Sequence, residues 1–275
     1  MPELPEVETT VRGLRRVLDG RRLTRVTLHR ADLRWPFPDG LVQRLVGATI
    51  TGLGRRAKYG LIATDRDDTL IFHLGMSGRM RLDPTEIEKH DHVVFETGGG
   101  LEAGGHVVAF NDARRFGSLD LVPTADLDSF PGLAGLGPEP LGCDLYPVMK
   151  AAFEGRAAPV KALLLDQRVV AGLGNIYVCE ALNCARLHPA RAGGTVTAAK
   201  LKALATAIPA VLLDAIAAGG STLRDFAQVD GTLGYFQKSF RVYGREGEAC
   251  PRCAHVVKRI VQSGRSSFFC SFCQR

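Results

Sequence analysis

The start of the chain carries the spacing of an amphipathic helix. Apolar side chains recur at alternating steps of three and four residues, at Leu4, Val7, Val11, Leu14 and Leu18. This spacing predicts one apolar helical face, and the helix should end near Gly20. Pro5 suits the first turn, and Glu6 and Glu8 suit the positive end of the helix dipole. The first residues of the chain would then be held just ahead of a packed helix.

From about residue 22 to residue 122 the pattern changes to short strands. Runs rich in β-branched and aromatic residues alternate with turns that contain Gly, Asp and Pro; examples are RLTRVTLH, TLIFHLGM, HVVFET and HVVAFND. This pattern predicts an antiparallel β-sandwich or barrel. A loop rich in Pro and Gly, FPGLAGLGPEPLG, follows these strands and marks a domain boundary.

Beyond that loop the composition becomes helical. The candidate helices lie near 145–154, 159–166, 174–184, 197–218 and 221–227. The last thirty or so residues are too few for an apolar core of their own, so they need a staple, which the cysteines there can supply. We therefore expect an α+β protein in three parts, with bounds near 1–130, 131–240 and 241–275.

Composition and cysteine content limit the possible classes of protein. A chain of 275 residues with 45% hydrophobic residues can bury a sizeable core. It has no apolar run long enough to span a bilayer, and its first residues lack the basic and then apolar order of a signal peptide. We expect a cytoplasmic protein with no membrane partner. In that reducing compartment, seven cysteines with four in two CxxC pairs favour metal over disulfides.

The positive charge is concentrated at the C-terminal end. The whole chain has a formal charge of +6 and a pI near 9.0, which alone is a weak sign of a polyanionic partner. From Arg241 to Arg275, seven basic residues stand against two glutamates, a net charge of +5. Most of the excess therefore lies beside the CxxC pairs.

The strongest spacing signal is the C-terminal cysteine pattern. Two CxxC pairs are separated by sixteen residues and comprise Cys250, Cys253, Cys270 and Cys273. This spacing is typical of a four-thiolate zinc site on a β-hairpin, and such a site is structural because no coordination position stays open. The alternative is a pair of disulfides or four buried thiols. Arg265, near the tip of that hairpin, is either a phosphate contact or a plain surface arginine.

Two further segments favour phosphate binding without proving it. Gly172 and Gly174 precede a helix that begins near Asn175, where backbone N–H groups and the helix dipole attract anions. The alternative is a tight turn between helices, capped by Asn175. Lys161, one short helix earlier, could serve the same phosphates or be solvated.

The β-rich half contains candidates for a wedge that enters the duplex. The two segments HLGMSGRM and NDARRFGSLD each carry a large side chain next to glycine on an expected turn, and the candidates in them are Met76, Arg114 and Phe116. Taken singly, Phe116 is more often a core residue and Arg114 a solvated one. Lys58 in RRAKYG and His73 could line the same groove, although a lone histidine near a strand is more often a satisfied core residue.

The motifs together resemble formamidopyrimidine-DNA glycosylases. They occur in order as PELPEVET, RRAKYG, HLGMSG, KHDH, NDARRFG, LGPEPL, GLGNIY, DGTLGYF, VYGREGEAC and the terminal cysteine pairs. The resemblance runs from Pro2 to Gln274. It implies an N-terminal antiparallel β-sandwich with flanking helices, a helix-two-turns-helix module, and a β-hairpin zinc finger with one structural Zn²⁺. It also implies excision of oxidised purines from damaged double-stranded DNA by a monomeric, nucleoid-associated enzyme.

The resemblance assigns roles to individual residues. The catalytic residues would be Pro2, Glu3, Glu6 and Lys58. The DNA-binding residues would be His73, Met76, His92, Arg114, Phe116, Lys161, Asn175, Tyr243 and Arg265, with Met76, Arg114 and Phe116 as the wedge. A lid over the damaged base would run from about Gly219 to Tyr235.

Two features depart from the family pattern. The usual Asp-Pro before the two arginines is Asp112-Ala113 here, which could loosen the turn that directs Arg114. The segment GGGLEAGGH is unusually rich in glycine, but it lies outside the matching motifs.

The resemblance also gives the chain terminus a chemical role. Removal of Met1 would leave Pro2 with a secondary amine, and a terminal amine titrates near 7.7 to 8, about two units below lysine. The adjacent helix N-terminus would lower that pKa further. The amine could attack the sugar C1′ and form an iminium, while Glu3 supplies protons. Glu6 would be either a supporting acid or only a helix-start residue.

Two other functions remain open at this point. An endonuclease VIII-like glycosylase for oxidised pyrimidines would share Pro2, Glu3 and the zinc finger, whereas PELPEVET, the long lid and Arg114 favour the purine enzyme. A non-catalytic zinc-ribbon DNA-binding protein would not need the Pro2-Glu3 pair.

Overall fold

The chain folds into two units that are interleaved in sequence. The computed structural model describes residues 2–98, 104–223 and 226–275. The first unit comprises residues 1–134 together with 218–235, and the second comprises 135–217 together with 236–275. The first unit therefore takes residues 218–235, called here the return segment, from within the region where the sequence predicts helices.

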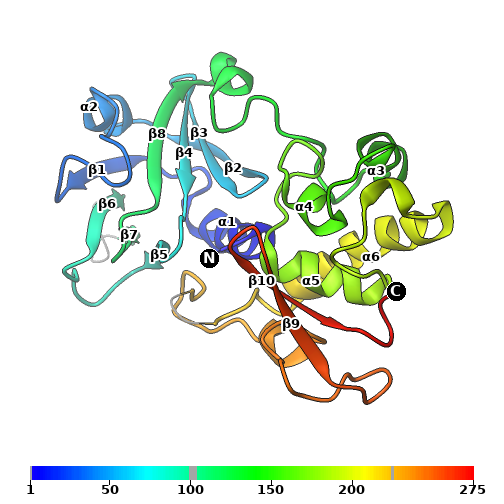
Figure 1. Cartoon of the computed structure of the whole chain (residues 1–275). Helices are drawn as coiled ribbons and strands as arrows, with labels where there is room; N and C mark the ends of the chain where they lie inside the picture. Colours follow the sequence, from blue (N-terminus) through cyan, green and yellow to red (C-terminus); the bar gives the residue numbers. More distant parts are fainter. Residues whose placement is uncertain (1, 99–103, 224–225) are drawn as a thin grey trace. The chain divides into compact units, whose positions relative to one another are not determined.

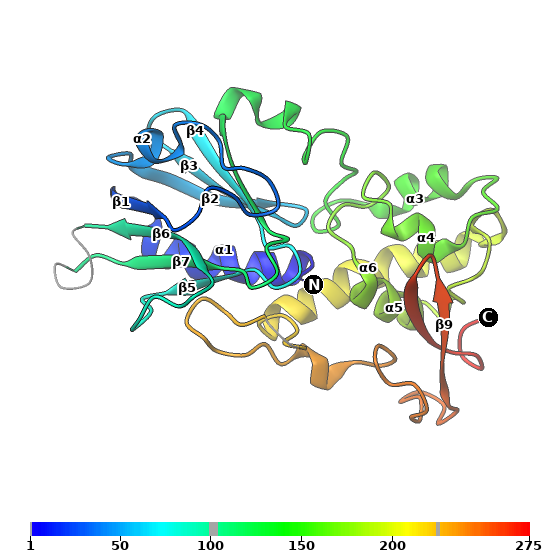
Figure 2. The same ribbon diagram turned by 60° about the vertical axis from the view of Figure 1, so that its left-hand side comes forward.

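The first unit contains the predicted antiparallel sandwich. Its first sheet has the strand order β1-β6-β7-β5 and its second has the order β2-β3-β4-β8, with antiparallel neighbours throughout. Figure 2 shows the two layers, with helix α1 beside them. The bounds are α1 Leu4–Leu18, β1 Leu23–Leu28, α2 Leu41–Leu45, β2 Ile50–Arg56, β3 Tyr59–Thr64, β4 Asp68–His73, β5 Arg79–Leu82, β6 Asp91–Thr97, β7 Val107–Asn111, β8 Ser118–Pro123 and the 3₁₀ turn η2 Thr124–Ser129.

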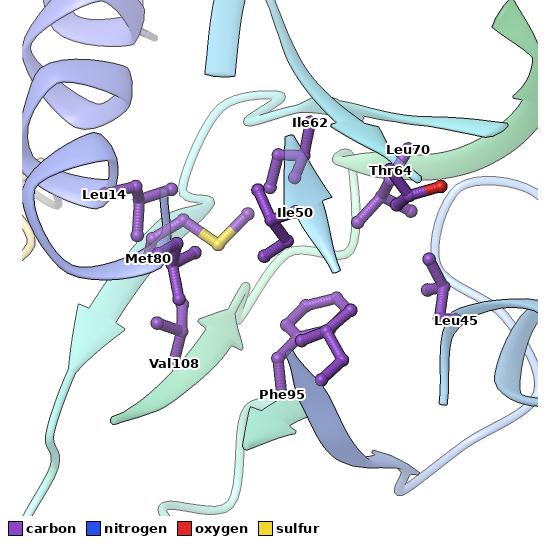
Figure 3. Close-up of a pocket in the computed structure, with 11 residues that line it drawn as sticks. Leu14, Leu45, Ile50, Ile62, Thr64, Leu70, Met80, Phe95 and Val108 are labelled. Carbon is purple, nitrogen blue, oxygen red and sulfur yellow. The ribbon is translucent and has the colours of Figure 1, made fainter. Parts of the chain in front are cut away.

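Alternating side chains fill the space between the sheets and α1. The apolar face of α1 is buried at all five of the positions that its spacing predicted. Leu14 from this helix meets Phe95 and Val108 from one sheet and Ile62 and Leu70 from the other around a cavity of about 10 Å³ (Figure 3). Because its lining is apolar apart from one threonine and it has room for about one water molecule at most, this cavity is part of the core and not a binding site.

The second unit is helical and ends in a β-hairpin. Four of the predicted helices and the hairpin are confirmed, with α5 against strand β10 (Figure 1). The bounds are α3 Leu145–Phe153, α4 Val160–Leu165, α5 Asn175–Cys184, η3 Gly193–Thr195, α6 Ala198–Ala217, η4 Phe236–Ser239, β9 Val257–Gln262 and β10 Arg265–Cys270. In the described parts of the chain, no helix is long and apolar enough to cross a membrane.

The predicted helix at 221–227 is wrong for the residues that the structure describes there. Gly219 and Gly220 take positive φ angles of 75° and 83°, which turn the chain away from the direction of α6. Ser221 then forms an isolated antiparallel bridge with Tyr235. Residues 224–225 of this predicted helix, and 99–103 of the glycine-rich segment, lie outside the described residues.

Candidate active site and DNA-binding surface

The residues that open the chain are held at the N-terminus of α1. Pro2 and Glu3 are buried, and Glu3 is the extended N-cap residue of the helix. Its backbone N–H donates to Glu6 Oε2 at 2.8 Å, as part of a reciprocal capping box. A capping box satisfies backbone donors that the helix cannot. The Pro2-Glu3 pair therefore has a fixed position relative to the helix axis.

Glu6 connects these residues to the return segment. Its second carboxylate oxygen, Oε1, accepts from the backbone N–H of Ser221 at 2.8 Å. Gly220, at positive φ, packs so closely that an added Cβ would lie 3.2 Å from the same oxygen. The return segment is also bonded to β5, because Leu82 N–H donates to the carbonyl of Val229 at 2.7 Å. Glu6 is thus more than a helix-start residue, since it fixes Glu3 and Ser221 together.

The register of the second sheet gathers predicted site residues at one end. Tyr59 in β3 pairs with His73 in β4, and His73 pairs with Ser118 in β8. These paired residues are strand ends. The same end of the sheet therefore carries the turn before β3, the segment after β4 and the turn before β8. These segments carry Lys58, Met76, Arg114 and Phe116.

The turn that carries Lys58 is tied to α1. Ala57 in this turn has a positive φ of 52°, and its carbonyl accepts from Arg55 Nη1 at 2.8 Å. Arg55 Nε donates to Glu8 Oε2 of α1 at 2.9 Å. The mostly buried Arg55 therefore links the Lys58 turn to the helix that carries Pro2 and Glu3.

His73 is kept neutral by its surroundings. Burial, followed by the charges of Lys58 and Arg34, lowers the pKa of His73 to about 4. Its Nδ1 accepts from the backbone N–H of Gly75 at 3.1 Å, which leaves Nε2 as the protonated nitrogen. A neutral imidazole with a fixed Nε2–H is a hydrogen-bond donor for a phosphate oxygen.

The lowered pKa of His73 predicts how stability depends on pH. The unfolded chain binds a proton at this ring near pH 6.5, but the folded chain does so only near pH 4. Stability from this group should therefore be complete above pH 6.5 and fall as the pH drops towards 4. We expect an NMR titration midpoint near 4 and a weaker fall in Tm for His73→Gln between these pH values. A midpoint near 6.5 would contradict this.

The three predicted wedge residues lie in the turns at this end of the sheet. Met76 is 36% exposed and Phe116 is 44% exposed, which is high for large apolar side chains. The guanidinium of the exposed Arg114 lies 4.9 Å from the centre of the Phe116 ring. The default interpretation of Phe116 as a core residue is therefore wrong, whereas the exposure of Arg114 agrees with a solvated side chain that also contacts the Phe116 ring.

His92, a predicted DNA-binding residue, lies behind the turn that carries Arg114. The ring is buried, and Nε2 lies 2.8 Å from the carbonyl oxygen of Asp112, to which it donates. The imidazole therefore supports the turn that carries Arg114, and its contact with DNA stays a prediction. His90 in the same KHDH motif is the more exposed of the two histidines.

The four C-terminal cysteines converge as predicted. Their sulfur atoms, from Cys250, Cys253, Cys270 and Cys273, all lie within 4.8 Å of one another. Tetrahedral zinc–thiolate bonds of about 2.3 Å put the sulfurs about 3.8 Å apart, so this donor set fits one zinc ion. The cysteines flank the two strands of the hairpin, which would be too small to fold without the metal.

Lys161, a predicted DNA-binding residue, is buried against this hairpin. The side chain is 1% exposed, and Nζ donates to the Ser266 carbonyl at 2.9 Å and to Ser267 Oγ at 2.6 Å. Such burial does not fit the solvated alternative, and the phosphate contact stays a prediction. Lys161 holds the hairpin against helix α4.

The remaining predicted contacts of the second unit surround the hairpin. Asn175 Nδ2, at the start of α5, donates to the Ser266 carbonyl at 2.9 Å, one residue from the exposed Arg265. The ring of Tyr243 packs edge-on against Phe268 of β10, with centroids 5.1 Å apart. The fold therefore brings Asn175, Tyr243 and Arg265 to one hairpin, from three separate stretches of sequence.

Sequence reasoning missed two residues that organise these surfaces. Glu180, 1% exposed in α5, accepts from the backbone N–H groups of Arg241, Val242 and Tyr243. Burial raises the pKa of its carboxyl, and the three backbone donors oppose that rise. Arg34 lies close enough to His73 to influence its pKa. A lone acid in the apolar run IYVCEALNC was the available signal for Glu180, whereas nothing in the sequence singled out Arg34.

Three family descriptions match successive parts of the chain. Residues 1–119 match the formamidopyrimidine-DNA glycosylase N-terminal domain, 136–227 match its H2TH domain, and 247–275 match the zinc finger found in FPG and IleRS. The formamidopyrimidine-DNA glycosylase of Novosphingobium aromaticivorans is 64% identical over 280 residues, and that of Sphingopyxis alaskensis is 62% identical over 276 residues. Each of these matches covers 100% of both chains.

Solved structures agree with the sequence relatives. The MutM (Fpg) protein from Thermus thermophilus is 41% identical with a TM-score of 0.88, covering 99% of this chain and 98% of that one. Lactococcus lactis Fpg bound to DNA with an abasic site is 34% identical, and its complex with DNA containing an oxidised pyrimidine is 33% identical. Both have a TM-score of 0.89 and cover 100% of both chains. The chain belongs to the formamidopyrimidine-DNA glycosylase family.

Proposed function

We propose that this protein removes oxidised purines from duplex DNA through a covalent bond between Pro2 and the deoxyribose, and then nicks the strand. The observation that carries the proposal is the fixed Pro2-Glu3 pair at the N-terminus of α1, joined by Glu6 to the return segment. A frayed terminal tail would need none of these contacts. The match to one family of glycosylases over the whole chain gives the reaction class.

Pro2 is the proposed nucleophile. Once Met1 is removed, the Pro2 nitrogen is a secondary amine close to the positive end of the α1 dipole, which favours its neutral form. Attack on the sugar C1′ forms a C–N bond, the bond from C1′ to the base breaks, and the nitrogen loses its proton. Opening of the sugar ring then gives an iminium, which is cationic without needing a proton. This cation withdraws electrons, so the bonds to the 3′ and then the 5′ phosphate can break by β,δ-elimination.

Glu3 is the proposed proton donor, and Glu6 positions it. Protonation of the ring oxygen O4′ allows the sugar to open, and the same carboxyl can return that proton in later steps. Glu6 acts through Glu3, because its carboxylate accepts a hydrogen bond from the backbone N–H of Glu3. Burial of both acids keeps water from competing with the amine for C1′.

DNA binding is proposed for both units. The damaged nucleotide must leave the base stack before Pro2 can reach C1′, and the exposed Met76, Arg114 and Phe116 would fill the space it vacates. In the same unit, Lys58 and the neutral His73 would bind phosphate. In the second unit, phosphate contacts would come from Asn175, Tyr243 and Arg265 around the zinc hairpin.

The described part of the return segment would cover the extruded base. Its exposed apolar side chains are Leu223, Leu233 and Tyr235, and its buried Phe226 and Val229 anchor it to the first unit. We further propose that the protein acts as a monomer in the cytoplasm, at the nucleoid. Four thiolates that must stay reduced to bind zinc support that compartment.

The substrate panel that tests the proposal compares lesions in one sequence context. We expect single-turnover excision of 8-oxoguanine opposite cytosine to be faster than excision of an oxidised pyrimidine, and each product strand to be nicked. Faster excision of the pyrimidine would favour the endonuclease VIII-like alternative. Tight duplex binding with no excision of either lesion would favour a non-catalytic DNA-binding protein.

A wider lesion range is the second candidate function. The Lactococcus lactis relative forms a complex with DNA that contains an oxidised pyrimidine, so a protein with this similar fold could accept both classes of base. Comparable excision rates for purine and pyrimidine lesions would support this candidate.

Arg114 should read the base that is left behind after extrusion. A guanidinium only donates hydrogen bonds, and cytosine presents O2 and N3 as acceptors, whereas adenine places its N6 donor towards the arginine. Excision should therefore be fastest opposite cytosine and slowest opposite adenine. Because one bidentate contact contributes about 1–3 kcal/mol of discrimination, Arg114→Ala should reduce the cytosine-to-adenine rate ratio by about 5-fold to 150-fold.

The neighbouring Arg115 provides the matched control. It is exposed on the same turn, so Arg115→Ala removes the same charge but should keep the cytosine-to-adenine ratio. If Arg114→Ala keeps the full ratio as well, Arg114 does not read the opposite base.

A further inference from the structure

The two turns that carry the wedge residues meet at one buried carboxylate. Asp112, directly after β7, is 0% exposed. Its Oδ1 accepts from Ser77 Oγ at 2.5 Å, and Ser77 follows Met76 in the first turn. Its Oδ2 accepts from the backbone N–H of Gly117 at 2.7 Å, and Gly117 follows Phe116 in the second turn. One side chain therefore bonds to the neighbour of each apolar wedge residue.

The same hydrogen-bond network reaches Arg114 and the KHDH segment. Ser77 Oγ accepts from the backbone N–H of Arg114 at 3.1 Å, so the serine hydroxyl relays the bond from Asp112. On the other side, the Asp112 backbone bonds to both histidines: its N–H donates to the His90 carbonyl at 3.0 Å, and its carbonyl accepts from His92 Nε2 at 2.8 Å. Three loops are thus joined at one residue.

Glycines allow the two turns to pack backbone to backbone. A Cβ added at Gly75, which has a φ of +62°, would lie 2.3 Å from the carbonyl carbon of Phe116. A Cβ added at Gly117 would lie 3.0 Å from Asp112 Oδ2 and 2.8 Å from the Phe110 ring. The backbones of the two turns are therefore in direct contact at Gly75 and Phe116, and Gly117 packs closely on Asp112.

We infer that Asp112 is a positioning residue that holds Met76, Arg114 and Phe116 as one preassembled wedge before DNA is bound. The inference rests on the wedge of the proposed function. A wedge that is rigid in the free protein loses little conformational entropy when it enters the duplex. The network also accounts for Ala113: hydrogen bonds on both sides fix the turn, so the rigid ring of a proline is not required there.

The inference differs from a merely structural role in what it predicts. A carboxylate that only stabilises the fold would affect every activity of the enzyme alike when replaced. A residue that positions the wedge should affect extrusion of an intact damaged base far more than cleavage at an abasic site, where no base has to be unstacked.

Two variants test this with separate perturbations. Asp112→Asn keeps the shape but offers one acceptor where two donors, Gly117 N–H and Ser77 Oγ–H, now bond. Ser77→Ala removes the relay to Arg114 and leaves Asp112 in place. We expect each variant to slow single-turnover excision of 8-oxoguanine opposite cytosine, by up to about 100-fold for a wedge misplaced by about 1 Å. Strand cleavage at a preformed abasic site should change little.

Asp68→Asn is the matched control for loss of a buried carboxylate. Asp68 forms an ion pair with Arg44. It is the first residue of β4, at the opposite end of the strand from the wedge turns. We expect it to lower thermal stability without changing the ratio of base excision to abasic-site cleavage. If Asp112→Asn does not fold, Ser77→Ala alone must show the altered ratio.

A double-mutant cycle separates this inference from the proposed wedge itself. If Asp112 acts through the wedge, Arg114→Ala should reduce the excision rate by a smaller factor in the Asp112→Asn background than in the wild-type background. Loss of excision in Arg114→Ala, with unchanged excision in Asp112→Asn and Ser77→Ala, would overturn this inference alone. Unchanged excision in all three variants would overturn the wedge as well. A uniform loss of excision and abasic-site cleavage would also overturn the positioning role.

Discussion

A protein that retains Met1 is expected to bind damaged DNA but to release no base. The nitrogen of Pro2 is then an amide, whose lone pair is delocalised and cannot attack the sugar. Loss of a catalytic nucleophile reduces turnover on the order of 10⁶-fold, so excision should fall to background. Protein prepared with and without aminopeptidase processing, with the terminus checked by mass, allows this comparison at constant sequence.

Covalent trapping gives the same prediction a positive readout. Borohydride added during turnover should reduce the iminium and leave processed protein joined to DNA, with the adduct on Pro2. Protein that retains Met1 should not be trapped. Pro2→Gly is the matched variant: it keeps a terminal amine but a primary one, so its imine needs a proton to become a cation, and trapping should be slower but present.

The Glu3→Gln variant separates the role of the Pro2 amine from that of the Glu3 acid. It keeps the terminal amine and nearly the same shape but cannot donate a proton to O4′. We expect near-normal binding and no release of an intact damaged base, with some adduct on an abasic site where the base has already gone. Peptide mapping decides the nucleophile. An adduct on Lys58 with Pro2 unmodified would refute the mechanism and leave the proposed DNA-binding surfaces intact.

Local patterns in the sequence were enough to predict most of the fold. The spacing of α1, the alternation in the strands and the paired cysteines each depend on neighbours within about one element, and each is confirmed. The helix predicted at 221–227 failed because its conformation depends on contacts far along the chain. Ser221 bonds to Glu6, 215 residues earlier in the sequence, and pairs with Tyr235.

Side-chain direction was the part of the candidate site that the sequence could not predict. Lys161 and His92 are polar residues in matching motifs, and polarity alone favours the surface. Both are buried because a long-range partner satisfies them: the hairpin carbonyl of Ser266 for the lysine, and the carbonyl of Asp112 for the histidine. The role of Asp112 was hidden for the same reason, since Ser77 lies 35 residues away.

Loss of zinc is expected to abolish duplex binding while most of the helical signal survives. The hairpin has only two strands, and it packs on its unit through polar contacts such as those of Lys161 and Asn175 and through a small cluster that includes two of the four zinc-site cysteines and has the other two packed against it. Zinc binding contributes about 10–16 kcal/mol in small fingers, so the hairpin should unfold when the metal is removed. The helices α3 to α6 have their own core and should keep their circular dichroism.

Two cysteine variants and one arginine variant separate the effect of losing zinc from the effect of losing a phosphate contact. Cys250→Ser should lose zinc and duplex binding together, whereas Cys143→Ser, an exposed cysteine outside the cluster, should lose neither. Arg265→Ala should keep the zinc, weaken binding to all sequences, and lower the slope of log K against log salt by about 0.9. The metal acts through the hairpin and not through chemistry, because four thiolates leave zinc no open position. Undiminished duplex binding by metal-free protein would contradict this role, and an unchanged salt slope would remove Arg265 from the phosphate contacts.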